Sequence, residues 1–210
     1  VIISTFEYQN FGLNVLTISF LVTVGFTFFL QLPGLIGQAK TLWENKSAEG
    51  VETITFIAFF SYFLITLIYM FSIASVAGII NSLVLLPPQV FILAALCKFK
   101  KLRLVDVAVG IIGAVLVTGM LLPEWRTVIF TSASILVFFG LLLQPLTMIR
   151  TRSVENIAVS FPRNFTIVTL VWTIYGLTIG DWYVAGSSGA LMLVYLLTTV
   201  LWYAYRKPST

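Results

Sequence analysis

Two residue types that often carry chemistry are scarce in the sequence, which contains no histidine and a single cysteine, Cys97. Histidine is the commonest metal ligand and the side chain that titrates near neutral pH. A single cysteine forms neither an internal disulfide nor a cysteine metal site. We therefore expect no metal centre and no cofactor. We also expect the protein not to be an enzyme, because no nucleophile–base pair is visible.

Charged residues are scarce as well. They make up 10% of the 210 residues, whereas 59% are hydrophobic, and the mean hydropathy is +1.03. Soluble domains rarely have this composition, which is typical of a polytopic helical membrane protein. A membrane-spanning helix needs roughly 20 apolar residues, so the chain has room for about seven spans with short loops. The net charge of +4 does not indicate a nucleic-acid partner, because the basic residues lie in the loops.

Seven apolar stretches are predicted to span the membrane, at residues 11–37, 51–70, 73–97, 105–122, 127–148, 159–179 and 182–205. With seven spans, one side of the membrane holds ten basic residues: Lys40, Lys46, Lys98, Lys100, Lys101, Arg103, Arg150, Arg152, Arg206 and Lys207. The other side holds Arg126. This bias predicts that the N-terminus lies outside and the C-terminus in the cytoplasm.

A short polar signature occurs twice along the chain, since Gln38, Lys46, Ser47 and Glu49 recur as Gln144, Arg152, Ser153 and Glu155. The offset is 106 positions for the outer members. An odd linker span lets two repeats share one orientation. We therefore expect an all-α membrane protein with two parallel three-helix bundles, spans 1–3 and spans 5–7, joined by linker helix 4. The predicted units are residues 1–97, 98–126 and 127–210.

Four motifs of the second half, in order along the chain, resemble those of the SWEET sugar-transporter family within the wider PQ-loop group: Ser153-Val-Glu155, Trp172-Thr-Ile-Tyr175-Gly176, Asp181-Trp-Tyr-Val-Ala185 and Tyr203-Ala-Tyr205-Arg206. In the first half, Lys46-Ser47-Ala-Glu49-Gly50 fits, and Asn81 falls at the family's third-helix asparagine. The resemblance covers nearly the whole chain and implies transport of a sugar.

The sequence departs from the family pattern in both halves. The Pro-Gln pair that names the wider group appears as Gly37-Gln38 and Leu143-Gln144. The third-helix asparagine of the second repeat is replaced by Ser188, and the tryptophan of the first repeat by Thr66. The resemblance therefore implies an asymmetric pocket.

The predicted substrate-binding residues are Asn81, Trp172, Ser188 and Thr66. Asn81 lies near the middle of span three, where an unpaired amide is costly, so it should face a neighbouring helix or a watery cavity. Its amide offers donors and an acceptor, which suits a sugar hydroxyl. Contact between helices is the alternative role. Trp172 could stack on a sugar ring or anchor the span at the membrane interface.

The remaining candidate residues are predicted to open and close the substrate pathway at its two ends. The resemblance implies that Tyr175 and Asp181 help to close the extracellular side, together with Tyr69, the counterpart of Tyr175. An aromatic belt is the alternative for the tyrosines. At the cytoplasmic side we predict a gate or hinge. Gln38 and Gln144 would cap the mouth, and prolines remove backbone hydrogen bonds and provide bending points, so the hinge residues would be Pro33, Pro145 and Pro162.

The predicted function is facilitated, bidirectional and uncoupled transport of a mono- or disaccharide by alternating access. Proton-coupled carriers usually place a titratable group at membrane depth, whereas the acidic residues here lie in loops or at span ends. Two alternatives stay open. One is a PQ-loop carrier for an amino acid or another small neutral or zwitterionic solute, and the other is a seven-helix cargo receptor without transport.

The predicted partners are the sugar and the lipid bilayer. We expect the plasma membrane as the location, with an organelle membrane as the alternative. Small residues let helices approach closely, so the spacings Gly78/Ser82 and Gly186/Ala190 could serve internal packing or contacts in a homo-oligomer.

Overall fold

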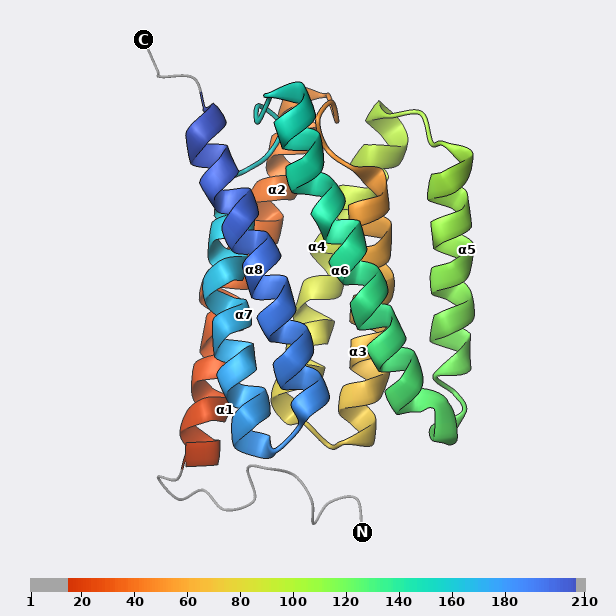
Figure 1. The fold of residues 1–210 in the computed structure, drawn as a ribbon, viewed down its shortest axis with the longest axis vertical. Coiled ribbons are helices and arrows are strands. Elements are labelled where there is room, and N and C mark those ends of the chain that lie inside the picture. Colours follow the sequence, from red (N-terminus) through yellow and green to blue (C-terminus); the bar gives the residue numbers. More distant parts are fainter. Residues whose placement is uncertain (1–14, 207–210) are drawn as a thin grey trace.

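The computed structural model describes residues 15–206, and every long element in that range is a helix (Figure 1). The first segment comprises α1 (Val15–Phe26), a π-helical turn η2 (Thr27–Gln31) and α2 (Leu32–Asn45). The later helices are α3 (Thr53–Ser72), α4 (Val76–Phe99), α5 (Leu104–Gly119), α6 (Arg126–Thr151), α7 (Ser160–Ile179) and α8 (Trp182–Tyr205), with a short 3-10 turn η3 (Pro123–Trp125) before α6. These seven segments of the described range match the number of spans predicted from the sequence.

The first segment differs most from its prediction. Its helix continues to Asn45, well beyond the expected end at residue 37, and Trp43, expected in a loop, lies in α2. Residues 11–14 of the predicted span lie outside the described range. The polar residues after residue 37 mark the end of the apolar run but not the end of the helix, which extends beyond the hydrocarbon thickness.

Five segments are long and apolar enough to cross a membrane: Val15–Asn45, Thr53–Ser72, Val76–Phe99, Pro123–Thr151 and Trp182–Tyr205. The apolar helix α5 is shorter, with 16 residues. Helix α7 carries Arg163 and Asn164 near its N-terminus. Large hydrophobic side chains such as Phe29 and Leu104 are exposed on the outside of the bundle, at 80% and 87%. The protein is therefore an integral membrane protein.

The two ends of the bundle differ in charge. We call the end with loops 46–52, 100–103 and 152–159 the basic end, and the end with turns 73–75, 120–125 and 180–181 the opposite end. The basic end is uppermost in Figure 1. Lys207, one of the basic residues counted in the sequence, lies outside the described range.

Each half of the chain packs its last helix against the other two. Helix α4 contacts α3 and α2, and α8 contacts α7 and α6. The halves meet where the first segment packs on α7 and where α3 packs on α6, while α5 lies beside α3 and α6 (Figure 1).

Backbone conformations repeat at the 106-residue offset, and we call two residues at this offset repeat mates. Lys46 and Arg152 both end their helices in the left-handed region, with φ of 48° and 49°. Ala74 and Gly180 are also left-handed, with φ of 56° and 74°. Glycine takes this conformation freely, whereas alanine does so with strain. The two halves therefore have matching turns.

The interfaces between the halves also repeat. A Cβ added to Gly34 would lie 3.2 Å from the carbonyl oxygen of Ser160 in α7. Its repeat mate Gly140 approaches α3 in the same way, since an added Cβ would lie 3.3 Å from Ala58 Cβ. Thr55 Oγ1 also donates a hydrogen bond of 2.7 Å to the Gly140 carbonyl. Glycine thus allows the halves to touch closely at two equivalent points.

Candidate functional site

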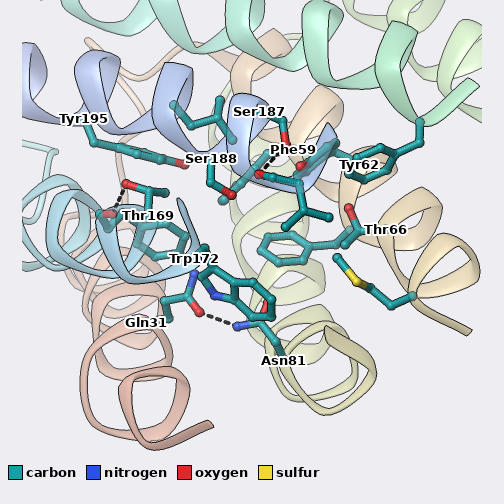
Figure 2. Close-up of a pocket in the computed structure, with 16 residues that line it drawn as sticks. Gln31, Phe59, Tyr62, Thr66, Asn81, Thr169, Trp172, Ser187, Ser188 and Tyr195 are labelled. Carbon is teal, nitrogen blue, oxygen red and sulfur yellow. Dashed lines mark hydrogen bonds between the residues drawn. The ribbon is translucent and has the colours of Figure 1, made fainter. Parts of the chain in front are cut away.

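A central cavity lies between the two halves (Figure 2). Its walls are largely aromatic and include rings from both halves, namely Phe59, Phe63, Phe130, Phe165 and Trp172. The space open to the centres of water molecules is about 50 Å³. That volume holds about four water molecules, so a sugar ring would need the walls to move apart.

The structure brings all four predicted substrate-binding residues to this cavity. Asn81 from α4, Thr66 from α3, and Trp172 and Ser188 from α7 and α8 line it together (Figure 2). Each is at least nine-tenths buried. Trp172 therefore lies in the interior rather than at the outer surface, and its ring meets Tyr175 edge-on, with the ring centres 5.2 Å apart. Substrate binding by these residues stays a prediction.

Asn81 is held by the π-helical turn of the first segment. Its Nδ2 donates a hydrogen bond of 2.8 Å to Thr27 Oγ1 and another to Gln31 Oε1. An extra residue in a π turn changes which side chains face inward, and such turns are frequent at functional sites. Asn81 thus joins two helices and also faces the cavity, beside Gln31. Gln31 was not among the residues predicted from the sequence, although a glutamine within an apolar run is a visible signal.

The second half supplies hydroxyl groups in place of this amide pair. Helices α4 and α8 begin at the same 106-residue offset, so the counterpart of Asn81 is Ser187 and not Ser188, the residue predicted from the sequence. Ser188 is the repeat mate of Ser82. Ser187, Ser188 and Tyr195 all line the cavity. The asymmetry implied by the family departures is therefore present, and Ser187 and Tyr195 were missed by the sequence analysis.

At the opposite end, two hydrogen bonds join the halves, and we call them the tyrosine bridges. The hydroxyl of Tyr69 donates to Asp181 Oδ2 at 3.1 Å. The hydroxyl of Tyr175 is bonded to Ser75 Oγ at 2.9 Å. Tyr69 and Tyr175 are repeat mates, and so are Ser75 and Asp181. Ser75 and Asp181 also cap the N-termini of α4 and α8, so the caps double as partners of the tyrosines.

At the basic end, Gln38 of the first half binds the loop before α7. Its Nε2 donates to the Asn156 carbonyl at 3.0 Å, and its Oε1 accepts from the Ala158 amide at 3.1 Å. Gln38 is 1% exposed. An ordinary interfacial glutamine would face water, so this residue serves as a link between the halves.

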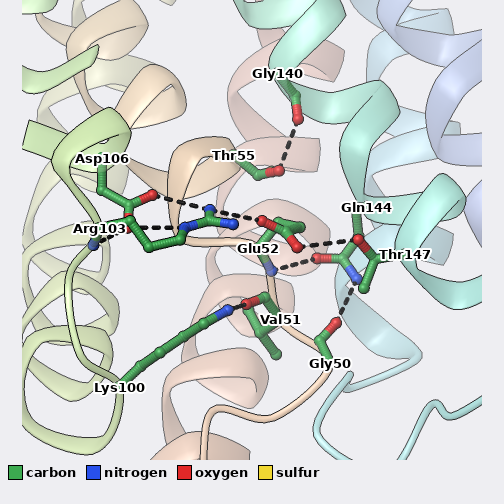
Figure 3. Close-up of polar contacts among 10 residues, drawn as sticks. All are labelled: Gly50, Val51, Glu52, Thr55, Lys100, Arg103, Asp106, Gly140, Gln144 and Thr147. Carbon is green, nitrogen blue, oxygen red and sulfur yellow. Dashed lines mark hydrogen bonds and ion pairs between the residues drawn. The ribbon is translucent and has the colours of Figure 1, made fainter. Parts of the chain in front are cut away.

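Gln144 makes the equivalent link from the second half (Figure 3). Its Nε2 donates to the Gly50 carbonyl at 3.1 Å, and its Oε1 accepts from the Glu52 amide at 3.2 Å. Gly50 and Glu52 are the repeat mates of Asn156 and Ala158. We call the four hydrogen bonds of Gln38 and Gln144 the glutamine bridges. They join the two halves at the basic end as the tyrosine bridges do at the opposite end, and the predicted gate roles of these residues stay predictions.

A charged cluster ties α5 to the glutamine bridges (Figure 3). Arg103 pairs with Asp106 at 3.0 Å and with Glu52 at 3.1 Å. Its hydrogen bond to Asp106 raises the pKa of the Arg103 guanidinium above its ordinary value, so the group stays charged. Glu52 Oε1 also accepts a bond of 3.0 Å from Thr147 of α6. Glu52 therefore joins α3, α5 and α6 beside Gln144.

The three candidate hinge prolines lie in different settings. Pro33 is the second residue of α2, just after the π-helical turn, and is exposed. Pro145 is buried within α6, and Pro162 is buried in the first turn of α7. Pro33 and Pro145 are not repeat mates, because the mate of Pro33 is Phe139. Their role as hinges stays a prediction.

The chain is similar to a family model and to a solved structure. A family model described as "Sugar efflux transporter for intercellular exchange" matches residues 127–210. Among solved structures, a eukaryotic SWEET transporter aligns with 17% sequence identity over 88% of this chain and 98% of its own, with a TM-score of 0.49. No curated protein matches the chain. The matched residues contain the four motifs of the second half that resemble the SWEET family, so the family model agrees with that resemblance.

Proposed function

We propose that this protein carries a mono- or disaccharide across a membrane by facilitated diffusion. The observation that supports this most is the chemistry of the central cavity, where aromatic rings alternate with the neutral amides and hydroxyls of Gln31, Asn81, Ser187 and Ser188. Aromatic faces suit the apolar faces of a sugar ring, and amides and hydroxyls can both donate to and accept from its hydroxyl groups. The family model that matches residues 127–210 is described as a sugar efflux transporter.

We infer that the chain is built as two parallel three-helix bundles joined by α5, with units 1–97, 98–126 and 127–210. Helices α4 and α8 have equivalent neighbours, and the turns, caps and interface glycines repeat at one offset of 106. The family model matches the residues of the second unit. These repeated features support the two-bundle architecture.

Alternating access would follow from breaking one set of bridges at a time. Both the tyrosine bridges and the glutamine bridges connect the two halves. With both sets formed, the cavity is narrow and closed to a sugar. Loss of one set would let the halves separate at that end, while the other set keeps the far end closed.

The transport is proposed to be uncoupled from protons. Glu44, Glu52 and Asp106 make ion pairs at the basic end. Asp181 lies at the opposite end as a helix cap. We further propose that the basic end faces the cytoplasm, since positively charged loops are retained on that side.

The proposal is tested by counterflow of radiolabelled glucose and sucrose in proteoliposomes, with and without a protonophore. We expect saturable uptake of one or both sugars that the protonophore does not change. Asn81→Ala and Trp172→Ala should reduce it, while Trp125→Ala is a matched control because Trp125 is 56% exposed outside the cavity. Uptake abolished by the protonophore would contradict the uncoupled mechanism. Absence of sugar flux, followed by uptake of an amino acid, would favour the other type of carrier.

A further inference from the structure

Tyr195 of α8 has a buried hydroxyl without a hydrogen-bond partner in the described part of the chain. The residue is 2% exposed and lines the central cavity. Its ring is held on several sides by aromatic neighbours, with ring centres 5.1 Å from Phe165, 5.8 Å from Phe161 and 6.4 Å from Phe59. The ring therefore has a fixed place, and its hydroxyl has a fixed direction.

The hydroxyl points back towards Ser188 (Figure 2). Helical side chains lean towards the N-terminus of their helix, and Ser188 precedes Tyr195 by two turns, or about 10 Å along the axis. The Tyr195 hydroxyl thus enters the same cavity from the side of the basic end, in the direction of the Ser188 hydroxyl.

Packing does not explain the hydroxyl. A phenylalanine would fill the same aromatic cage, and a buried polar group without a partner destabilises the fold relative to an apolar one. Its repeat mate Gln89 is also buried without a side-chain partner in residues 15–206, but Gln89 does not line the cavity. Of Gln89 and Tyr195, only Tyr195 therefore lies where it can bind a ligand in the cavity.

We propose that the Tyr195 hydroxyl is a substrate-recognition group that hydrogen-bonds one hydroxyl of the transported sugar. This inference rests on the proposed function, because it names a further residue of the same cavity. The sugar would lie between Tyr195 on the side of the basic end and the Asn81–Gln31 pair contributed by the first half. Sugar binding would give the Tyr195 hydroxyl a partner, which the protein groups of residues 15–206 do not provide.

The test compares Tyr195→Phe with the wild type in the counterflow assay. Loss of one hydrogen bond between neutral groups should raise the half-saturating sugar concentration about threefold to tenfold. The melting temperature should stay equal or rise, because the variant removes only an unpaired hydroxyl. If the Tyr195 hydroxyl instead served to stabilise the fold, Tyr195→Phe would lower the melting temperature. Tyr203→Phe is the matched control, since Tyr203 lies on the same helix, outside the cavity, and is 45% exposed.

A series of glucose analogues, each lacking one hydroxyl, identifies the contact. The analogue that lacks the hydroxyl contacted by Tyr195 should bind to the wild type and to Tyr195→Phe with equal affinity. The hydrogen bond is then absent in both proteins. If the wild type transports sugar and Tyr195→Phe has the same half-saturating sugar concentration, this assignment is overturned. The proposed function would still stand. Absence of sugar transport by the wild type would overturn both.

Discussion

The hydroxyl of Tyr69 and the carboxylate of Asp181 are 3.1 Å apart, and their repeat mates Tyr175 and Ser75 are joined in the same way at 2.9 Å. Each tyrosine thus reaches from one half of the chain to the helix cap of the other. The glutamine bridges show the same reciprocity at the basic end. The hydrogen bonds between the halves are therefore reciprocal at both ends of the bundle.

Tyr69→Phe should loosen the opposite end without disturbing the packing there. The ring of Tyr69 stacks on Phe130, with centres 4.2 Å apart, and phenylalanine keeps this contact. Only the bond to Asp181 is lost, so the population open at that end should rise about twofold to tenfold. The reporter is a thiol introduced into the cavity by Ser188→Cys, in a Cys97→Ser background. It should react correspondingly faster with a membrane-impermeant thiol reagent added from the outside.

Substitutions of Asp181 distinguish its hydrogen bond to Tyr69 from its role as the N-terminal cap of α8. Asp181 Oδ1 accepts from the Tyr183 and Val184 amides, so Asp181→Ala should also lose about 1 kcal/mol of stability. Asp181→Asn keeps a capping side chain. Unchanged labelling of the reporter thiol in Tyr69→Phe would mean that the tyrosine bridge does not hold this end closed.

The glutamine bridges predict equal effects from symmetric substitutions. Gln38→Ala and Gln144→Ala each remove two hydrogen bonds at the basic end. Each should therefore expose the reporter thiol at position 188 to reagent from the basic side, by a similar factor. The double variant should open that side further than either single variant. In inside-out vesicles, a labelling rate equal to that of the parent in all three variants would contradict the role of these residues as a gate.

The number of segments could be predicted from the sequence because long apolar runs alternate with charged loops. The repeat and its register were also visible in the polar signature, and this register places Tyr69 and Tyr175 at equivalent points. The family resemblance, rather than the repeat, indicated Asn81, Thr66, Trp172 and Ser188, all of which line one cavity.

Other features depend on tertiary contacts. The π-helical turn directs Thr27 and Gln31 towards Asn81, and no local pattern marks such a turn. Tyr195 resembles any core aromatic residue in an apolar helix, and only its unpaired hydroxyl distinguishes it. The two small-residue spacings, Gly78/Ser82 and Gly186/Ala190, also have different surroundings in the structure. An added Cβ on Gly78 would meet Met70 of the same half, whereas Gly186 has no contact there.

Gln31→Met should weaken sugar binding while keeping the volume of the side chain. Gln31 accepts a hydrogen bond from Asn81, and methionine leaves the Asn81 amide attached only to Thr27. We expect the half-saturating sugar concentration to rise about threefold to tenfold. Gln89→Met is the matched control because Gln89 is buried outside the cavity lining. Equal transport by both variants and the wild type would exclude Gln31 from the site.

Ala74→Gly should stabilise the protein. Ala74 has φ of 56°, a conformation in which a Cβ is strained, while its repeat mate is Gly180 with φ of 74°. A glycine relieves this strain but also increases the freedom of the unfolded chain, so the net gain should be about 0.5–1 kcal/mol. Gly180→Ala should cost a similar amount. No atom lies within 4 Å of the added Cβ at that position, so the cost comes from the backbone alone. Thermal unfolding in detergent measures both changes, and a lower melting temperature for Ala74→Gly would show that the turn between α3 and α4 is not strained.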